Sequence, residues 1–359
     1  MDDSLSLILY LIRQFAGERS LSGIYHVLRG KPSAQPQQDS FLFGVRRFFH
    51  VFDQLERQAF NAWIARLDKQ QAIKPLHDES DRFVITETGE AAYAQWQSRH
   101  SFPDGLLYTH HIQEEQLFWQ KLQLLTQTLS ELSGGERAFV PVTRSAQAAE
   151  YVRLYVHHFQ RQYALPALAA RFCRQLSAHL QSLPMLEANI LVAQLSGYRS
   201  GGMTTAQIAS ALTLDPVRVQ LLFKSALRTL MHRIELASAD APDLVGMIKI
   251  ESSGLSHSAE RTLHILQHGL SIEELATRRQ LKRGTIEDHL VEIVLKVDAF
   301  DVSCYLSDKE QRLILEAARE LKTKELRVLK HRLGHRFTFF QIRLALALQA
   351  VAERNFADG

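Results

Sequence analysis

Four side chains in the middle of the sequence have the chemistry to bind nucleic acid. They lie along one predicted helix and are Arg218, Gln220, Lys224 and Arg228. Arginine and lysine donate hydrogen bonds to phosphate oxygens, and arginine and glutamine also reach base edges in the major groove. Their spacing predicts that much of one helix face is turned outward to contact DNA.

A later segment carries a second, weaker set of such donors. Its predicted helix begins with Lys282, Arg283 and Thr285 and continues with Glu287 and Asp288. The two carboxylates would be repelled by a phosphate backbone. We therefore expect this helix to face protein, or to touch DNA only at its N-terminal end.

Both sets of donors lie in segments that match each other at an offset of 67 residues. The matched apolar positions are Ile208, Ala209, Leu214, Val219, Phe223 and Leu227 in the first copy, and Leu275, Ala276, Leu281, Ile286, Leu290 and Val294 in the second. A helix-turn-helix needs a small residue where its helices cross, an apolar plug in the turn and a β-branched anchor on the second helix. We predict two helix-turn-helix units, and the alternative for each is an ordinary helical hairpin that binds no nucleic acid.

The predicted starts of these units carry helix-capping residues. Thr205 and Ser271 are the predicted N-caps, and Glu274 lies three residues after Ser271 as in a capping box. Charge also favours the first copy, because residues 137–236 hold eleven Lys and Arg against four Asp and Glu, whereas the whole chain carries +3. Such an excess is typical of a phosphate-contacting face, although arginine-rich helices also occur for solubility alone.

Composition predicts a mostly α-helical protein of two or three domains. The 359 residues include only 9 prolines and 17 glycines, and apolar residues recur at helical spacing. No apolar run approaches the roughly 20 residues of a membrane span. The two cysteines, Cys173 and Cys304, cannot form a disulfide framework or a CxxC metal clip. We therefore expect a cytoplasmic protein without a membrane association.

Four segments follow from the pattern of helices and breaks. Residues 1–100 are predicted to form a winged-helix-like domain, in which helices are followed by a β-hairpin. Residues 101–236 read as a helical domain that ends in the first helix-turn-helix. Residues 237–257, rich in Ser, Ala, Asp and Gly, read as a linker, and residues 258–355 as a C-terminal helix-turn-helix domain.

Histidine spacing raises a metal hypothesis that the sequence does not support. The pairs four residues apart are His110 with Glu114, His111 with Glu115, and His264 with His268. Two ligands do not make a metal site, and no HExxH motif is present. The chain also lacks the GxxxxGK[ST], GxGxxG and GxSxG motifs of nucleotide-binding sites and hydrolases. We therefore expect no catalytic residues, no metal and no cofactor, and hence no enzyme activity.

Several strings resemble the YpbB-like family, helix-turn-helix proteins of low-GC Gram-positive bacteria that are encoded beside a RecQ-type helicase. They are GERSLSGIYHVLRGKPSAQ (17–35), FGVRRFF (43–49), GYRSGGMTTAQIA (197–209), LFKSALRTLMHRI (222–234) and SIEELATRRQLKRGTIEDHL (271–290). The last string also resembles the helix-turn-helix at the C-terminus of some RecQ helicases. The resemblance implies a non-catalytic DNA-binding protein that partners a RecQ-type helicase in DNA repair or recombination.

The alternative hypothesis is a transcription regulator that dimerises on a palindromic DNA sequence. A regulator usually combines one DNA-reading unit with one dimerisation or ligand module. This chain instead spreads a winged helix and two helix-turn-helix units over three predicted modules, which favours the accessory protein. Gel shifts distinguish the two hypotheses, because an accessory protein would prefer a DNA structure and a regulator would prefer a sequence.

Overall fold

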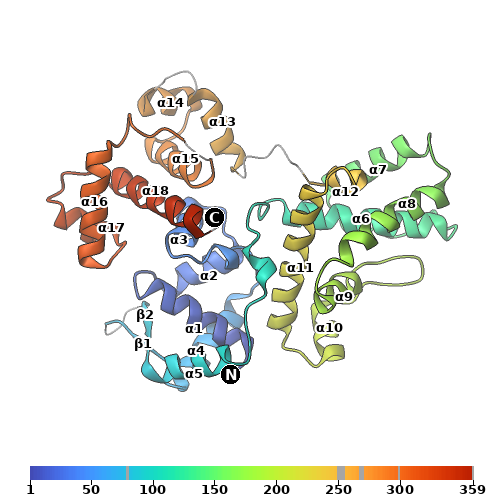
Figure 1. The fold of residues 1–359 in the computed structure, drawn as a ribbon, viewed down its shortest axis with the longest axis horizontal. Helices are drawn as coiled ribbons and strands as arrows, with labels where there is room; N and C mark the ends of the chain where they lie inside the picture. Colours follow the sequence, from blue (N-terminus) through green and yellow to red (C-terminus); the bar gives the residue numbers. More distant parts are fainter. Residues whose placement is uncertain (78–80, 249–254, 267–270, 298–299, 358–359) are drawn as a thin grey trace. The chain divides into compact units, whose positions relative to one another are not determined.

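The computed structural model in Figure 1 describes residues 1–77, 81–248, 255–266, 271–297 and 300–357. The protein is mostly α-helical, and the described residues contain one two-stranded sheet. The chain forms two compact units, one of the described residues of 5–99 and 253–359, and one of residues 2–4 with the described residues of 100–252. Among the described helices, none combines the length and the apolar character that crossing a membrane requires.

The N-terminal region of the first unit contains the predicted helices followed by a hairpin. Its elements are α1 (Asp3–Phe15), α2 (Leu21–Arg29), α3 (Ala34–Leu42), the 3-10 helix η1 (Arg46–Phe48), α4 (Arg57–Lys69), β1 (Ile73–Pro75), β2 (Phe83–Ile85) and α5 (Glu87–Gln97). The strands pair antiparallel, with Ile73 opposite Ile85. Ser20 and Thr86 cap α2 and α5 by accepting hydrogen bonds from backbone N–H groups of the first turn. The order of helices and hairpin predicted for this region is therefore present.

The C-terminal region completes this first unit with six helices. They are α13 (His257–Leu266), α14 (Ile272–Arg279), α15 (Arg283–Lys296), α16 (Asp308–Leu321), α17 (Leu326–Arg332) and α18 (Phe339–Ala357). Helix α15 packs against α13, α14 and α18, and both α15 and α18 pack against α3 of the N-terminal region.

Polar contacts also join the N- and C-terminal regions. The backbone N–H of Lys324 donates to the carboxylate of Glu18 at 2.9 and 3.0 Å, and Arg82 forms an ion pair with Glu325 at 3.1 Å. The structure thus differs from the predicted division, in which residues 1–100 and 258–355 were separate domains.

The second unit is an all-helical assembly around one long central helix. Its elements are the 3-10 helix η2 (Asp104–Leu107), α6 (Glu115–Ser133), α7 (Ala146–Phe159), α8 (Leu165–Leu180), α9 (Met185–Ala193), α10 (Thr205–Leu212), α11 (Pro216–Leu236) and α12 (Pro242–Val245). Helix α11 packs against η2, α6, α8, α9, α10 and α12. Its apolar residues join those of α6 and α8 in one continuous core.

The predicted linker at residues 237–257 is wrong over residues 241–248, which belong to the second unit. Helix α12 lies in this stretch, and Leu244 and Met247 are buried in the core. The buried carboxylate of Asp243 accepts hydrogen bonds from Arg171 Nε at 2.8 Å and Nη2 at 3.0 Å, and from Gln175 Nε2 at 2.8 Å. No sign of this packing is visible in the sequence, because the segment is rich in Ser, Ala and Asp. Residues 249–254 of the predicted linker lie outside the described part of the chain.

Candidate nucleic-acid interface

Both predicted helix-turn-helix corners are present and have the same backbone conformation. Thr213 between α10 and α11 has φ 54°, and Gln280 between α14 and α15 has φ 53°, so both residues are left-handed. The N–H of Leu214 donates to the carbonyl of Ala209 at 2.9 Å, and that of Leu281 donates to Ala276 at 3.0 Å. The offset of 67 residues therefore relates two corners that match in conformation and hydrogen bonding.

The helix starts repeat at the same offset, with one correction. Ser271 caps α14 and forms a complete capping box with Glu274, as the sequence predicts. The N-cap of α10 is Thr204, whose hydroxyl accepts from the N–H of Gln207 while the Gln207 side chain accepts from the N–H of Thr204. The predicted cap Thr205 is wrong by one position, because Thr205 already belongs to the helix.

The outward helix face predicted for the first copy is wrong for Lys224 and Arg228, which are buried. Their exposed fractions are 5% and 3%. Lys224 Nζ lies 2.8 Å from Glu115 Oε2, and Arg228 Nε lies 2.5 Å from Glu115 Oε1. Arg228 Nη1 also donates to the carbonyl of Leu106 at 3.1 Å. These two cations hold α11 to α6 and η2 and are not available to a phosphate group.

The charges in this buried cluster compensate one another. Burial alone would raise the pKa of Glu115, but Arg228 and Lys224 outweigh it and hold the pKa below its ordinary range. A buried carboxylate that accepts from two cations stays charged, and each cation is paired in turn. The basic residues of α11 therefore serve the fold of the second unit.

The other two predicted DNA contacts on α11, Arg218 and Gln220, are only partly accessible. Arg218 is half-buried, and its Nη1 donates to the carbonyl of Ser101 at 2.7 Å. Gln220 is half-buried as well. Residues 221–231 are buried on every side of the helix. In this structure α11 does not present the predicted set of donors.

The second copy exposes the start of its second helix, where the sequence placed any DNA contact. Lys282 and Arg283 are exposed and Thr285 is half-buried in the first turn of α15. From Ile286 onward, much of the helix is buried against α13, α18 and α3. The preceding helix adds the exposed Arg278, which sequence reasoning missed. A cationic strip therefore surrounds the corner between α14 and α15.

Ion pairs offset the carboxylates that were expected to repel phosphate. The side chain of Arg283 contacts Glu273 and, at 2.9 Å, Glu287, yet 58% of it remains exposed. The hydrogen bond that Arg283 donates to Glu287, followed by the charge of Glu273, raises the pKa of Arg283 above its already high value. Asp288 is paired with Arg343 of α18. Glu273, Glu287 and Asp288 are thus paired with arginines, and Arg278 and Lys282 are exposed cations at the same corner.

A third corner of the same kind joins α16 to α17, and sequence reasoning missed it. Lys322 is left-handed with φ 50°, and the N–H of Thr323 donates to the carbonyl of Ala318 at 3.2 Å. Ser307 and Glu310 form a capping box at the start of α16. The positions that hold Leu281, Leu290 and Val294 in the second copy hold Thr323, Arg332 and Arg336 here, so a search for the repeated apolar pattern fails. The Ser-x-x-Glu start and the small Ala318 were the signals that could have found it.

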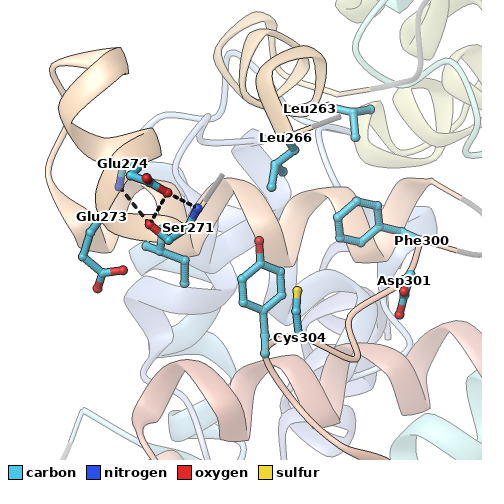
Figure 2. A pocket seen from close by; sticks show the side chains of 10 residues that line it. Leu263, Leu266, Ser271, Glu273, Glu274, Phe300, Asp301 and Cys304 are labelled. Atoms are coloured by element: carbon cyan, nitrogen blue, oxygen red, sulfur yellow. Dashed lines mark hydrogen bonds between the residues drawn. The ribbon is translucent and has the colours of Figure 1, made fainter. Parts of the chain in front are cut away.

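A pocket of about 610 Å³ lies at the start of α14, between α13, α14 and the segment from Phe300 to Tyr305 (Figure 2). Leu263, Leu266 and Phe300 give it an apolar wall, and Glu273 and Asp301 add carboxylates. The Glu274 carboxylate is already engaged by Ser271 in the capping box. An apolar hollow with acidic side chains repels phosphate, so this pocket is not part of the cationic strip.

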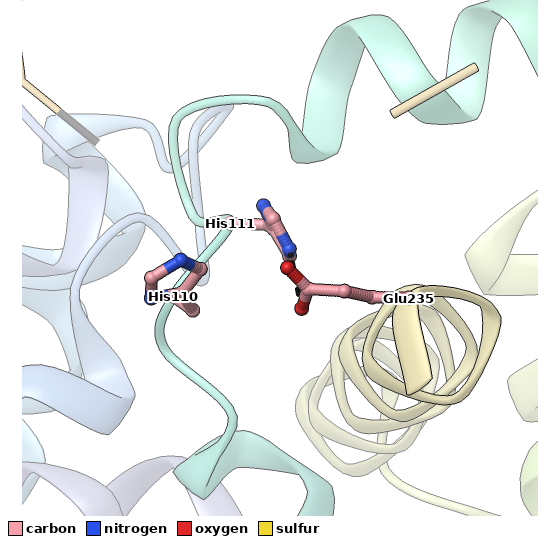
Figure 3. A group of neighbouring side chains, drawn as sticks. All are labelled: His110, His111 and Glu235. Atoms are coloured by element: carbon pink, nitrogen blue, oxygen red, sulfur yellow. Dashed lines mark hydrogen bonds and ion pairs between the residues drawn. The ribbon is translucent and has the colours of Figure 1, made fainter. Parts of the chain in front are cut away.

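The second unit brings together one group of possible metal ligands, shown in Figure 3. His110 and His111 lie in the turn before α6, and their ligand atoms and that of Glu235 on α11 are within 4.8 Å of one another. His111 Nε2 lies 3.0 Å from Glu235 Oε2. The predicted i,i+4 pairing of His111 with Glu115 is wrong, because Glu115 pairs with Lys224 and Arg228. His268 lies outside the described residues.

Within this group His111 and Glu235 are hydrogen-bonded to each other, and His110 is an exposed neighbour. Imidazole and carboxylate are ligands that zinc accepts, and bonds of about 2.0–2.1 Å would place tetrahedral ligand atoms about 3.4 Å apart. His110 would therefore have to approach the other two side chains to complete such a site.

Comparisons with known proteins agree with the helix-turn-helix geometry. Residues 258–346, which span the second and third corners, match the family described as "Helix-turn-helix domain". The whole chain is similar to "Protein YpbB" of Bacillus subtilis (strain 168), with 31% identity over 344 residues that cover 96% of each chain. No solved structure matches the chain.

Proposed function

The chain belongs to the YpbB family of helix-turn-helix proteins, and from this premise we propose that it is a non-catalytic DNA-binding protein that partners a RecQ-type helicase in DNA repair or recombination. The helicase partnership is supported by the resemblance of residues 271–290 to the helix-turn-helix tail of some RecQ helicases. A tail of this kind on a separate chain would act on the helicase in trans.

The observation that carries the DNA-binding part is the exposed cationic corner between α14 and α15. In helix-turn-helix proteins the N-terminal residues of the second helix contact DNA. Here Arg278, Lys282 and Arg283 surround that position and are exposed to solvent. Because arginine and lysine donate to phosphate oxygens whatever the sequence, this corner suits backbone contacts that position the protein on DNA.

The experiment is a titration of fluorescent duplex DNA with the full chain at several salt concentrations. We expect the variant Lys282→Ala/Arg283→Ala to bind more weakly and to lower the slope of log K against log salt by about one to two, since each phosphate contact contributes about 0.9. The control Arg153→Ala/Arg174→Ala removes the same charge from exposed positions on α7 and α8. A slope that is unchanged in the first variant contradicts this placement of the DNA contact.

A second experiment addresses the helicase. The full chain alone should hydrolyse no ATP, and it should change the rate at which the RecQ-type helicase of the same organism unwinds a forked substrate. ATP hydrolysis by helicase-free protein would refute the non-catalytic proposal. Strong preference for one DNA sequence, with no effect on unwinding, would favour the transcription regulator instead.

A further inference from the structure

The third helix-turn-helix differs from the other two in exposing most of its second helix. Within α17, Leu329 is the buried residue, and Arg327, Val328, His331 and Arg332 are exposed. The helix packs against α16 and α18 through one narrow side. By contrast, α11 is buried over residues 221–231, and much of α15 is buried from Ile286 onward. Of the three second helices, α17 exposes the largest share of its residues to solvent.

The charge around this helix is strongly positive. Residues 319–336 contain seven Lys and Arg and two acidic residues, with two histidines in addition. The exposed cations are Arg319, Lys322, Arg327, Arg332 and Arg336. The two acids, Glu320 and Glu325, pair with Arg332 at 3.0 Å and with Arg82 at 3.1 Å. Most of the positive charge is therefore not neutralised by carboxylates.

Three of these exposed cations have no carboxylate partner among the described residues, namely Arg319, Lys322 and Arg327. Within the part of the chain that the structure describes, none of their side chains takes part in an ion pair or a hydrogen bond. They come from the end of α16, the corner and the start of α17, so they surround one helix-turn-helix corner. Lys330 lies nearby over the ring of Phe339, at 4.3 Å from its centre, with its ammonium group at the same surface.

We propose that α17 and the corner before it form a second DNA-binding surface, which holds the phosphate backbone through Arg319, Lys322 and Arg327. Unpaired cations around an exposed helix-turn-helix corner match the anionic, regularly spaced oxygens of a duplex. The inference rests on the proposed DNA-binding function and assigns a larger share of the affinity to α17 than to α15. A duplex held by both corners would contact more phosphates than one corner can reach.

The test uses the full chain and a labelled duplex of random sequence in 50–200 mM salt. The variant Arg319→Gln/Lys322→Asn/Arg327→Gln should lower the slope of log K against log salt by about two to three, at about 0.9 for each lost contact. Asparagine is chosen for position 322 because it tolerates the left-handed conformation. The matched control Arg137→Gln/Arg153→Gln/Arg174→Gln removes equal charge from exposed positions of the second unit and should leave the slope almost unchanged.

A charge-preserving variant separates loss of contact from loss of fold. Arg319→Lys/Arg327→Lys keeps both positive charges and should retain the wild-type slope. A wild-type slope in the triple variant, with a reduced slope in Lys282→Ala/Arg283→Ala, overturns the α17 surface and leaves the proposed function standing. Loss of helicase binding by the triple variant with unchanged DNA binding also overturns it, because the surface would then serve an acidic protein. No duplex binding by the wild-type chain refutes the proposed function itself.

Discussion

At the residue scale, the main lesson comes from the cations of α11. Lys224 and Arg228 have the residue types and spacing of DNA contacts, yet they bind Glu115, which lies 109 and 113 residues away in the sequence. No local pattern in the sequence shows that Glu115 is their partner. The sequence alone therefore could not distinguish an exposed helix face that binds DNA from a buried cluster of ion pairs. Lys282 and Arg283 are exposed, as a DNA contact at the start of α15 requires, and burial of the helix begins at Ile286.

We predict that Glu115→Gln lowers the free energy of unfolding of the second unit by about 3–5 kcal/mol, because it leaves two buried cations without their partner. The measurement is urea-induced unfolding. Glu150→Gln, at an exposed position on α7, is the control and should change stability by less than about 0.5 kcal/mol. Equal stability of the two variants would show that the cluster does not hold the unit together.

The contribution of the Glu115 carboxylate to the free energy of unfolding depends on pH, and its direction follows from the pKa. Its pKa is lowered from an ordinary value of 4.5, so its contribution to stability is complete above that pH and is lost as the pH falls through the lowered pKa. We expect the stability difference between the wild-type chain and Glu115→Gln to be largest near neutral pH and to shrink below 4.5. Urea midpoints of both proteins at neutral and acid pH check this, and a difference that grows on acidification contradicts it.

At the element scale, the sequence predicted the two helix-turn-helix corners that share an apolar pattern and missed the third. A search for apolar positions depends on a repeated pattern, and the third unit has Thr323, Arg332 and Arg336 where the second has Leu281, Leu290 and Val294. Helix α3 also escapes a search by apolar periodicity, because its sequence AQPQQDSFL has no apolar stripe. Its polar residues Gln37, Gln38 and Asp39 are nevertheless buried, and Asp39 is paired with Arg19 at 2.8 Å.

The left-handed corners supply a prediction at this scale. A β-branched residue such as Thr213 is strained at positive φ by about 1–2 kcal/mol, whereas glycine is not. Thr213→Gly should therefore stabilise the second unit by about 0.5–1 kcal/mol after the greater chain entropy of glycine in the unfolded state is subtracted. Thermal unfolding measures the change, with Thr204→Ala as a comparison that removes the helix cap and should destabilise by about 1 kcal/mol. Destabilisation by Thr213→Gly would mean that the corner is not left-handed in solution.

At the scale of the whole molecule, the N- and C-terminal regions form one unit, which composition could not reveal. Sequence segments are judged one at a time, whereas this unit depends on α3 lying against α15 and α18, which follow it by roughly 250 and 310 residues. The region that resembles a winged helix and the matched helix-turn-helix domain are therefore parts of one body.

We accordingly predict that residues 256–359 are unstable without residues 1–99. Removing α3 exposes faces of α15 and α18 that it buries, and it also removes Glu18, the partner of the Lys324 backbone. Circular dichroism and urea unfolding of the fragment, alone and co-expressed with residues 1–99, measure the effect. A fragment that unfolds as cooperatively alone as with its partner would support the separate module predicted from sequence.

The central claim is that the first unit binds DNA through the corners of its matched helix-turn-helix domain. The most direct measurement is the salt dependence of duplex binding by the full chain, compared with a variant that combines Lys282→Ala and Arg283→Ala with Arg319→Gln, Lys322→Asn and Arg327→Gln. The account predicts that log K for the wild-type chain falls linearly with log salt. It also predicts that the combined variant lowers this slope by about four to five, because five contacts are lost and each contributes about 0.9. Duplex binding whose affinity and slope are the same in the combined variant and the wild-type chain would contradict it.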